Sequence, residues 1–434
     1  QPAGGAGEGY LFVHSHPFRR DGRYANQPWA QETPDPLTGQ VWDSWLEMSP
    51  GLASKLGVAY NDVVEVSTEA GKVEVAVHIL HHLRDDVVAL ALGQGHTASG
   101  RYADGYGVNA FSILPLAKDG AGAVPWSPLK ASLRKVGRAG DLVTAFSLFG
   151  TSDEDRNFGV SVSAEKLAKV GDAEAHHPGE LTGIAHLPMD KRLVEQGISD
   201  FYGLPDHPTY RFGMTVDTNA CTGCGACAVA CYAENNLPIV GKKKVAEGRE
   251  MGWLRVNRYI EDDGDIHFVP MMCQQCGHAG CENVCPVLAT YHTIDGLNAM
   301  VYNRCVGTRY CSNACPYTAR RFNFHTYAWP EPFNLQLNPD VMVREMGVME
   351  KCTFCVQRIR SVKSAYKDGG NFTRTVPSEA LEQLPACAEA CPSQALTFGN
   401  LKDEQGRIAR SRKSARSYEI LPELNSFRSE ERRV

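Results

Sequence analysis

Alternating apolar and polar positions mark a β-rich region in the first third of the chain. Residues 63–67 and 73–77 alternate with a period of two on either side of Gly71, which predicts a β-hairpin. The short apolar run at 87–92 predicts a further, buried strand. Short strands joined by tight turns are typical of small barrels, so residues 42–150 are expected to form a compact β-barrel.

The pattern is weaker on both sides of this region. Residues 1–41 are rich in Gly, Pro and Asp and are expected to form an extended arm. Residues 52–57 predict a short helix, because Ser-Pro precedes them and a glycine ends them. Residues 151–212 are mixed and polar, which predicts a connector. Residues 402–434 carry nine Lys/Arg against six Asp/Glu, which predicts a basic C-terminal tail.

Length and charge narrow the class of protein. The 434 residues are enough for two or three domains, and the net charge of −6 gives no sign of the basic face that nucleic acid requires. No apolar run approaches the length of about 18 residues typical of a membrane-spanning helix, so the chain is not expected to cross a membrane by itself. It begins at Gln1 rather than Met, which indicates a processed N-terminus or part of a longer polypeptide.

The cysteines decide the chemistry. All 15 lie between Cys221 and Cys391, in groups with metal-ligand spacing, whereas a disulfide-stapled secreted fold would be short and would scatter them. Thiolates are soft ligands that suit iron–sulfur clusters. Group one has the spacing C-x2-C-x2-C-x3-C, and a proline follows each of the other three. The four groups are Cys221, Cys224, Cys227 and Cys231; Cys273, Cys276, Cys281 and Cys285; Cys305, Cys311 and Cys315; and Cys352, Cys355, Cys387 and Cys391.

The last cysteine of each group is expected to serve a different cluster from the others. In two-cluster ferredoxins the fourth cysteine of this motif ligates the neighbouring cluster. This exchange requires pairs of groups: groups two and three form the inner pair, and groups one and four form the outer pair. The predicted sites are site A (Cys221, Cys224, Cys227 and Cys391), site B (Cys231, Cys352, Cys355 and Cys387), site C (Cys273, Cys276, Cys281 and Cys315) and site D (Cys285, Cys305 and Cys311).

Site D lacks one cysteine. Thr308 stands where group three would carry its second ligand. A threonine hydroxyl is a hard, neutral group and a poor substitute for a thiolate. The sequence therefore predicts three [4Fe–4S] clusters, at sites A to C, and one [3Fe–4S] cluster at site D.

Three other interpretations of these motifs are weaker. Structural zinc also uses C-x2-C pairs, but it does not favour a proline after the last ligand. The run at 273–278 resembles a c-type haem attachment site, but its histidine stands one residue too late. The run at 93–98 matches a dinucleotide fingerprint, but the glycine-rich stretch after it argues against the required helix.

Two family resemblances rest on these motifs. Residues 214–401 resemble the four-cluster ferredoxin subunits of membrane-bound molybdopterin oxidoreductase complexes, on the cysteine groups and on segments such as 303–307 and 351–355. Residues 42–120 resemble the C-terminal pterin-binding domain of the large subunit of such complexes, on segments such as the loop at 93–109. Together they imply an α+β chain in which a small pterin-binding-domain-like β-barrel precedes a double two-cluster ferredoxin-like domain at 213–401.

A fusion in this order resembles the iron–sulfur subunit of alternative complex III, a bacterial quinol oxidase of respiratory and photosynthetic chains. This resemblance implies electron transfer from quinol to c-type cytochromes and no molybdopterin in the barrel. It also implies a hetero-oligomeric complex with a polytopic quinol-binding membrane subunit and with multihaem and monohaem c-type cytochromes, on the periplasmic side of the cytoplasmic membrane. The family's chain has a longer N-terminal section than this one.

Two other functions share part of these features. The first is the electron-transfer subunit of a molybdenum-containing polysulfide- or tetrathionate-type reductase, and the second is a soluble ferredoxin-type hub. No general acid, base or nucleophile is expected in any of the three. Near the clusters, Arg304, Arg309 and Lys351 are expected either to raise reduction potentials through their charge or to form structural salt bridges.

Overall fold

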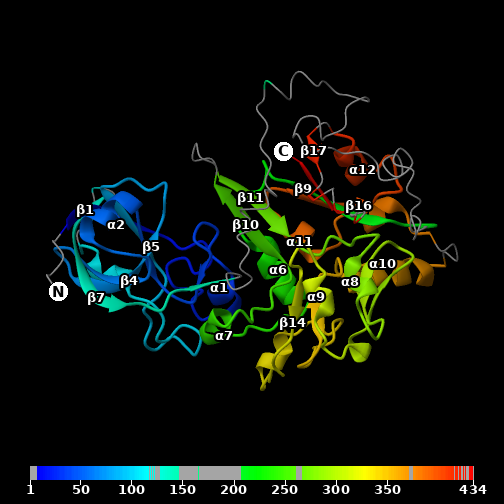
Figure 1. Ribbon diagram of the computed structural model, residues 1–434, viewed down its shortest axis with the longest axis horizontal. Helices are drawn as coiled ribbons and strands as arrows, with labels where there is room; N and C mark the ends of the chain where they lie inside the picture. Colours follow the sequence, from blue (N-terminus) through cyan, green and yellow to red (C-terminus); the bar gives the residue numbers. More distant parts are fainter. Residues whose placement is uncertain are drawn as a thin grey trace. The chain divides into compact units, whose positions relative to one another are not determined.

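The protein forms two compact units in a computed structural model, shown in Figure 1. Unit 1 comprises Gln1–Leu148 and Ile239–Glu250, and unit 2 comprises Phe149–Pro238 and Met251–Val434. The predicted connector at 151–212 lies outside the described residues except for 165 and 207–212. The structure describes residues 7–116, 118, 120, 122, 128–145, 165, 207–260, 266–370, 375–414, 416–418, 420–421, 424, 426 and 430–433.

Unit 1 contains the predicted β-barrel. Six strands close it in the order β1-β6-β3-β5-β4-β7, with parallel pairs β1–β6 and β3–β5 and antiparallel pairing elsewhere. The predicted hairpin is confirmed, because β4 and β5 pair from Val63↔Ala76 to Ser67↔Lys72. Inward side chains such as Leu11, Leu46 and Val64 fill the barrel. The strands are β1 (Gly7–His14), β3 (Trp45–Met48), β4 (Asp62–Ser67), β5 (Lys72–Ile79), β6 (Val87–Ala91) and β7 (Leu129–Ala139).

The expectation of an extended arm over 1–41 is wrong for the described residues. Strand β1 pairs with both β6 and β7, so it is an integral barrel strand. Leu11 and Val13 point inward and are buried, whereas Tyr10 and Phe12 are 44% and 48% exposed. The period of two was hidden because the aromatic residues Tyr10 and Phe12 occupy outward positions, so residues 10–13 form an unbroken apolar run.

The remaining elements of unit 1 are short. Helix α2 (Pro50–Leu56) confirms the predicted helix: the Ser49 hydroxyl accepts a hydrogen bond from the Leu52 amide at 3.1 Å, and Gly57 ends it with a left-handed φ of 63°. The others are α1 (Pro28–Glu32), the 3₁₀ helix η1 (Ala110–Ile113), α7 (Lys242–Ala246) and the paired strands β2 (Gln40–Val41) and β8 (Val143–Thr144).

Part of the predicted ferredoxin section belongs to unit 1. The segment Ile239–Glu250, which contains α7, leaves the 213–401 section and packs with the barrel unit. The buried Glu32 carboxylate accepts hydrogen bonds from the amides of Val240 at 3.0 Å and Gly241 at 2.7 Å, and from the Trp42 indole at 3.2 Å. The Glu32 carboxylate thus binds the segment Ile239–Glu250 through backbone amides of that segment. These residues are about 200 positions apart, so no local sequence pattern predicts the contact.

Replacing Glu32 with glutamine is expected to remove a pH dependence of stability. Burial raises the Glu32 pKa from 4.5 to about 7, although the amides of Val240 and Gly241 oppose this shift. The folded state then holds the proton more tightly than the unfolded state, so the unfolding free energy of unit 1 should fall as pH rises between these two values and stay level above them. The full shift corresponds to about 3 kcal/mol.

Hydrogen exchange of the barrel amides, corrected for intrinsic rates, measures this dependence in the intact chain. The wild type should lose protection between about pH 5 and pH 7, and Glu32→Gln should not. Glu8→Gln, on the barrel strand β1, is the matched control and should behave as the wild type does. An equal loss of protection in Glu32→Gln and the wild type would show that Glu32 is not the titrating group.

Unit 2 is built from short ribbons and helices (Figure 1), and four of these helices carry cysteines. A four-stranded sheet has the order β16-β9-β18-β17, and three two-stranded ribbons are β10–β11, β12–β13 and β14–β15. The strands are β9 (Phe212–Asp217), β10 (Arg255–Ile260), β11 (Ile266–Met271), β12 (Thr290–His292), β13 (Asn298–Met300), β14 (Arg320–Phe322), β15 (Met349–Lys351), β16 (Leu396–Asn400), β17 (Ser417–Tyr418) and β18 (Glu430–Arg433).

The helices of unit 2 are mostly one or two turns long, as expected for segments that only carry ligands between loops. They are α6 (Ala226–Glu234), α8 (Gly280–Asn283), η4 (Tyr302–Arg304), α9 (Tyr310–Asn313), η5 (Phe333–Gln336), α10 (Val356–Asp368), η6 (Ser378–Leu381), α11 (Ala386–Glu389) and α12 (Arg407–Arg412). Within the described ranges, no helix has the length and apolar character needed to cross a bilayer.

The expected basic tail at 402–434 is instead part of the fold. Strand β18 pairs in parallel with β9, and β17 pairs with β18, so this segment completes the sheet of unit 2. Ile408 and Tyr418 are each 1% exposed, and the Arg416 guanidinium bonds Asp217 at 2.9 Å. The excess of Lys and Arg concealed these few apolar positions, because an average over the segment does not show which face each residue occupies.

Candidate iron–sulfur sites

Four short helices position the cysteines in pairs. Helix α6 carries Cys227 and Cys231, one helical turn apart, so both thiols lie on the same side of the helix and serve adjacent sites. The other helices repeat this spacing, with the second cysteine of the pair just beyond the helix end. These pairs are Cys281 and Cys285 at α8, Cys311 and Cys315 at α9, and Cys387 and Cys391 at α11.

Site A surrounds a small cavity. All four of its predicted cysteines line this cavity, although Cys391 is separated from the others by more than 160 residues of sequence. The loop before α6 takes left-handed φ values at Gly223 (68°) and Gly225 (69°). A Cβ at Gly223 would lie 2.6 Å from the Phe268 ring, so only glycine allows this loop to close around the cavity.

Site B is the most deeply buried set. Burial raises the pKa of Cys387, and the next largest causes are the neighbouring thiols of Cys355, Cys352 and Cys231. The mutual repulsion shows that the structure brings these four groups together. The Asn235 amide nitrogen lies 3.6 Å from the Cys231 sulfur and 3.9 Å from the Cys355 sulfur, in position to donate to both.

Sites C and D are assembled from groups two and three. Burial raises the pKa of Cys276, and the thiols of Cys273, Cys315 and Cys281 raise it further, so the site C cysteines lie together. In site D, burial first raises the pKa of Cys311, and the thiols of its predicted partners Cys305 and Cys285 also contribute.

The Cys285 thiol is the least buried of those whose pKa is shifted. Burial would raise its pKa, but the amides of Thr290, Val287 and Ala289 outweigh burial and lower it below the ordinary value. The Ala289 amide donates to the Cys285 sulfur at 3.2 Å, and the Met349 amide donates to the Cys305 sulfur at 3.3 Å. Site D therefore combines a partly open position with backbone donors to its sulfurs.

Thr308 occupies the loop position that Cys224 occupies in site A. Gly307 and Arg309 flank it with φ values of 73° and 64°, matching the two left-handed glycines on either side of Cys224. A Cβ at Gly307 would lie 2.5 Å from the Gly347 carbonyl oxygen, so this turn is tightly constrained. The two loops are therefore built alike, and site D presents a hydroxyl where site A presents a thiol.

The residues present fit iron–sulfur clusters better than single metal ions. All 15 cysteines are free thiols. Across the described parts of the chain, no three His, Cys, Asp or Glu side chains come close enough to hold one ion. Each set brings together thiols from two cysteine groups around one space. Soft thiolates around such a space suit a multi-iron cluster.

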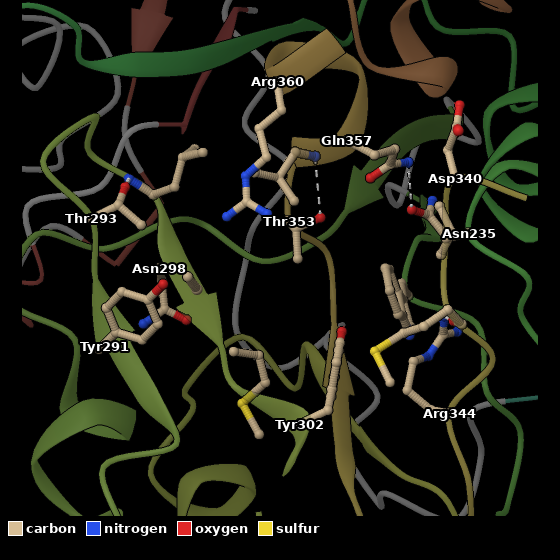
Figure 2. A pocket seen from close by; sticks show the side chains of 17 residues that line it. Asn235, Tyr291, Thr293, Asn298, Tyr302, Asp340, Arg344, Thr353, Gln357 and Arg360 are labelled. Carbon is tan, nitrogen blue, oxygen red and sulfur yellow. Dashed lines mark hydrogen bonds between the residues drawn. The ribbon is translucent and has the colours of Figure 1, made fainter. Parts of the chain in front are cut away.

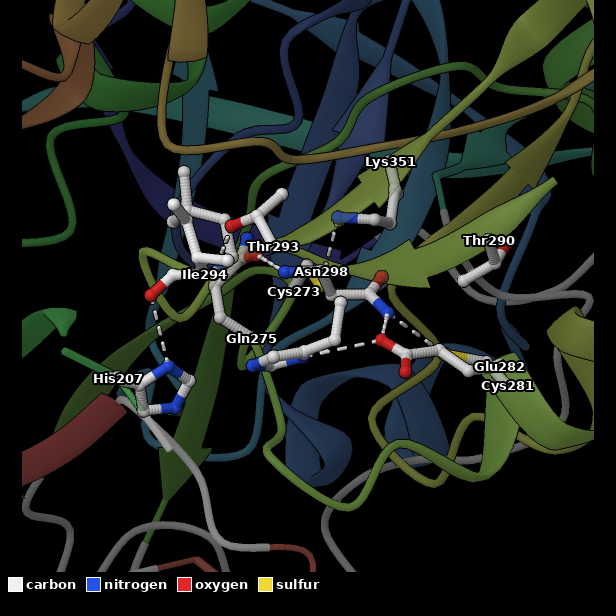
Figure 3. A network of polar contacts seen from close by, with 12 residues as sticks. His207, Cys273, Gln275, Cys281, Glu282, Thr290, Thr293, Ile294, Asn298 and Lys351 are labelled. Atoms are coloured by element: carbon white, nitrogen blue, oxygen red, sulfur yellow. Dashed lines mark hydrogen bonds and ion pairs between the residues drawn. The ribbon is translucent and has the colours of Figure 1, made fainter. Parts of the chain in front are cut away.

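Of the three cations expected to act on the sites, Lys351 contacts a cysteine sulfur. Lys351 is buried against site C, as shown in Figure 3, whereas Arg304 is exposed and Arg309 is exposed beside the Phe322 ring. Arg320 was not predicted, although its Nη2 lies 3.0 Å from the Cys281 sulfur. The position of Arg320 soon after Cys315-Pro316 did not predict a contact with a cysteine, because the cysteine that it contacts belongs to group two.

A cavity of about 250 Å³ lies beside site B (Figure 2). Its wall includes Asn235, which also contacts the site B sulfurs, and Thr353, which stands between Cys352 and Cys355 in sequence. The Gln357 side-chain amide donates to the Asn235 carbonyl oxygen at 3.3 Å and orients it. Asn235 is therefore shared between the cavity wall and the surroundings of the site B sulfurs.

Three family models match the chain. Residues 19–123 match the model described as Molydopterin dinucleotide binding domain. Residues 220–289 and 264–331 each match a model described as 4Fe-4S dicluster domain. The first match covers much of the barrel and the other two cover groups one to three, so the order of a pterin-binding-type domain before ferredoxin domains is confirmed.

Named relatives match about half of the chain. The menaquinone reductase iron–sulfur cluster-binding subunit of Nitratidesulfovibrio vulgaris is 38% identical over 224 residues, covering 50% of this chain and 86% of that protein. Hdr-like menaquinol oxidoreductase iron–sulfur subunit 1 of Archaeoglobus fulgidus is 35% identical and covers 46% and 74%. The B subunit of the polysulfide reductase of Wolinella succinogenes is 32% identical and covers 46% and 81%.

Proposed function

Because the chain belongs to the family of iron–sulfur subunits of redox complexes that these relatives represent, we propose that it conducts electrons from a quinol to c-type cytochromes in a complex like alternative complex III. The observation that carries this proposal is the convergence of 15 cysteines into four sets in a chain that also contains a pterin-binding-type barrel. The proposed cofactors are three [4Fe–4S] clusters at sites A to C and one [3Fe–4S] cluster at site D. Such clusters, when bound, accept and release single electrons.

The chain's own residues supply binding, insulation and charge. The cysteines of sites A to D are the proposed ligands. Two cysteines one helical turn apart, such as Cys227 and Cys231 on α6, serve neighbouring sites. Seven of the 15 cysteines, including all four of site B, are buried, and donors such as Asn235 and the Ala289 amide stabilise negative charge on the sulfurs. Consistent with the sequence prediction, the proposal assigns no general acid, base or nucleophile to this chain.

The partners belong to the same proposal. A polytopic quinol-binding membrane subunit and multihaem and monohaem c-type cytochromes are the expected neighbours, on the periplasmic side of the cytoplasmic membrane. Site D is expected to lie nearest the quinol, because a three-iron cluster suits electrons taken from quinol one at a time. Exposed apolar side chains next to its cysteines support this orientation: Leu288 and Val306 are each 66% exposed and Tyr310 is 59% exposed.

Placing a charge on this surface is expected to weaken attachment to the membrane partner. Leu288→Glu or Val306→Glu should release more of the chain from isolated membranes, because each would bury a carboxylate in an apolar interface. Leu335→Glu is the matched control, since Leu335 is 81% exposed but lies outside site D. A structure of the complex in which site D is farthest from the membrane subunit would overturn this electron path.

A second function is supported by the barrel and by one relative. The matching pterin-binding model and the polysulfide reductase relative favour the electron-transfer subunit of a molybdenum-containing reductase. We propose instead that the barrel holds no pterin and that the loop at 93–109 serves packing. Gly95 supports this, because a Cβ there would lie 2.1 Å from the Asn109 amide nitrogen, and Gln94 and Gln31 exchange two side-chain hydrogen bonds.

Metal analysis of the purified complex separates the two functions. The quinol-oxidising complex should contain iron and no molybdenum, and a polysulfide- or tetrathionate-type reductase should contain one molybdenum per complex. Reduction of the clusters by a quinol analogue, followed by electron paramagnetic resonance, tests the direction of transfer. One molybdenum per complex would sink the first function, and an iron-free chain would sink both.

A further inference from the structure

Arg320 is a buried cation that forms no ion pair with a carboxylate in the described part of the chain. It is 2% exposed. The guanidinium bonds the Thr290 hydroxyl at 3.0 Å and the Asn298 carbonyl oxygen at 2.8 Å, both neutral, and the Cys281 sulfur at 3.0 Å. A buried charge without compensation costs several kcal/mol. Among these direct contacts, the Cys281 sulfur is the one that can carry a negative charge, as a thiolate.

Lys351 repeats this arrangement on the other side of site C. It is 0% exposed, and its ammonium lies 3.6 Å from the Cys273 sulfur and 2.7 Å from the Cys352 carbonyl oxygen (Figure 3). The protein does use carboxylates for buried cations elsewhere, since the Arg344 guanidinium bonds Glu350 at 3.0 Å with both side chains buried. The absence of a carboxylate at Arg320 and Lys351, among the described residues, thus marks the thiolates as their counter-ions.

The two cations reach different sites. Arg320 also lies against helix α9, which carries the proposed site D ligand Cys311: the hydroxyl of Ser312, the next residue, donates to the Arg320 carbonyl oxygen at 3.5 Å. Arg320 therefore acts at the junction of sites C and D. Lys351 contacts the Cys273 sulfur of site C and the backbone carbonyl oxygen of Cys352 in site B, so its charge lies between these two sites.

We infer that Arg320 and Lys351 are built-in counter-ions that raise the reduction potential of site C, and that Arg320 does the same for site D. This inference rests on the proposed function, because it requires clusters at both sites. An electron added to a cluster adds negative charge beside the cation, so the cation stabilises the reduced form more than the oxidised form. The low dielectric of a buried site increases this difference.

Potentiometric titration of the full chain in its complex, followed by electron paramagnetic resonance, tests the inference. The site C signal is first assigned as the one lost in Cys276→Ala, and site D is followed by its three-iron signal. Arg320→Gln should raise the oxidised-to-reduced ratio at fixed potential at least about tenfold at both sites, which corresponds to about 59 mV for one electron. Lys351→Met should do so at site C and leave site D unchanged.

Two further variants keep the test decisive. Arg321→Gln removes a charge from the next residue of β14, whose Nε donates to the Gly252 carbonyl, and it should shift neither site. Arg320→Lys keeps the charge and should retain most of the wild-type potential, even if Arg320→Gln fails to hold iron. Unchanged potentials in Arg320→Gln and Lys351→Met, with iron intact, would overturn the inference alone. Absence of clusters from the wild type would overturn the proposed function.

Discussion

Replacing Thr308 with cysteine is expected to convert the [3Fe–4S] cluster of site D into a [4Fe–4S] cluster. Thr308 lies in a loop whose left-handed positions match those of the site A loop, so a cysteine there would present its thiol where Cys224 presents one. That thiolate would supply the ligand that site D lacks in the wild type, so the site could hold a fourth iron. The three-iron resonance of the oxidised protein should vanish, and the signals of sites A to C should stay.

Iron analysis gives an independent measure of the same change. The wild type should contain about 15 iron atoms per chain, from three four-iron clusters and one three-iron cluster, and Thr308→Cys should contain about 16. Thr308→Ser is the matched control, because it keeps a hydroxyl and should keep the three-iron signal. A wild-type count near 16, or no three-iron resonance in the oxidised wild type, would contradict the assignment of Thr308 as the missing-ligand position.

Replacing Cys391 with alanine is expected to damage the cluster of site A. Cys391 lines the site A cavity together with Cys221, Cys224 and Cys227, whereas Cys387, one helical turn earlier, lies with the thiols of site B. Removing one of four thiolates should cost the site most or all of its iron, about four atoms of the total. The measurement is iron content together with the resonance of each reduced cluster.

The partner variant makes the crossed arrangement decisive. Cys387→Ala should damage site B and spare site A, although Cys387 and Cys391 stand only four residues apart. The other three cysteines of site A belong to group one, and 160 positions separate Cys231, the last cysteine of that group, from Cys391. Damage to site A in Cys391→Ala would therefore act across this distance in sequence. If Cys391→Ala disturbed only the cluster built on Cys352, Cys355 and Cys387, ligation within each group would replace the crossed scheme.

The sequence by itself determined the ligand chemistry and much of the local structure. Cysteine spacing is a local property, because a loop and one helical turn position three or four thiols without help from the rest of the chain. The β4–β5 hairpin and helix α2 followed in the same way from period two and from the Ser49 and Gly57 caps. The family models then confirmed the order of the two domain types.

Only the tertiary structure decided which charges act on the sites and where the chain ends belong. Arg320 looks like an ordinary basic residue until ribbon packing brings it to a group two thiol 39 residues away. Strands β1 and β18 could not be predicted from the sequence, because they pair with strands that are remote in sequence: β6 and β7 for β1, and β9 for β18. Pairing and ion contacts of this kind depend on which segments meet in space, and neither composition nor periodicity carries that information.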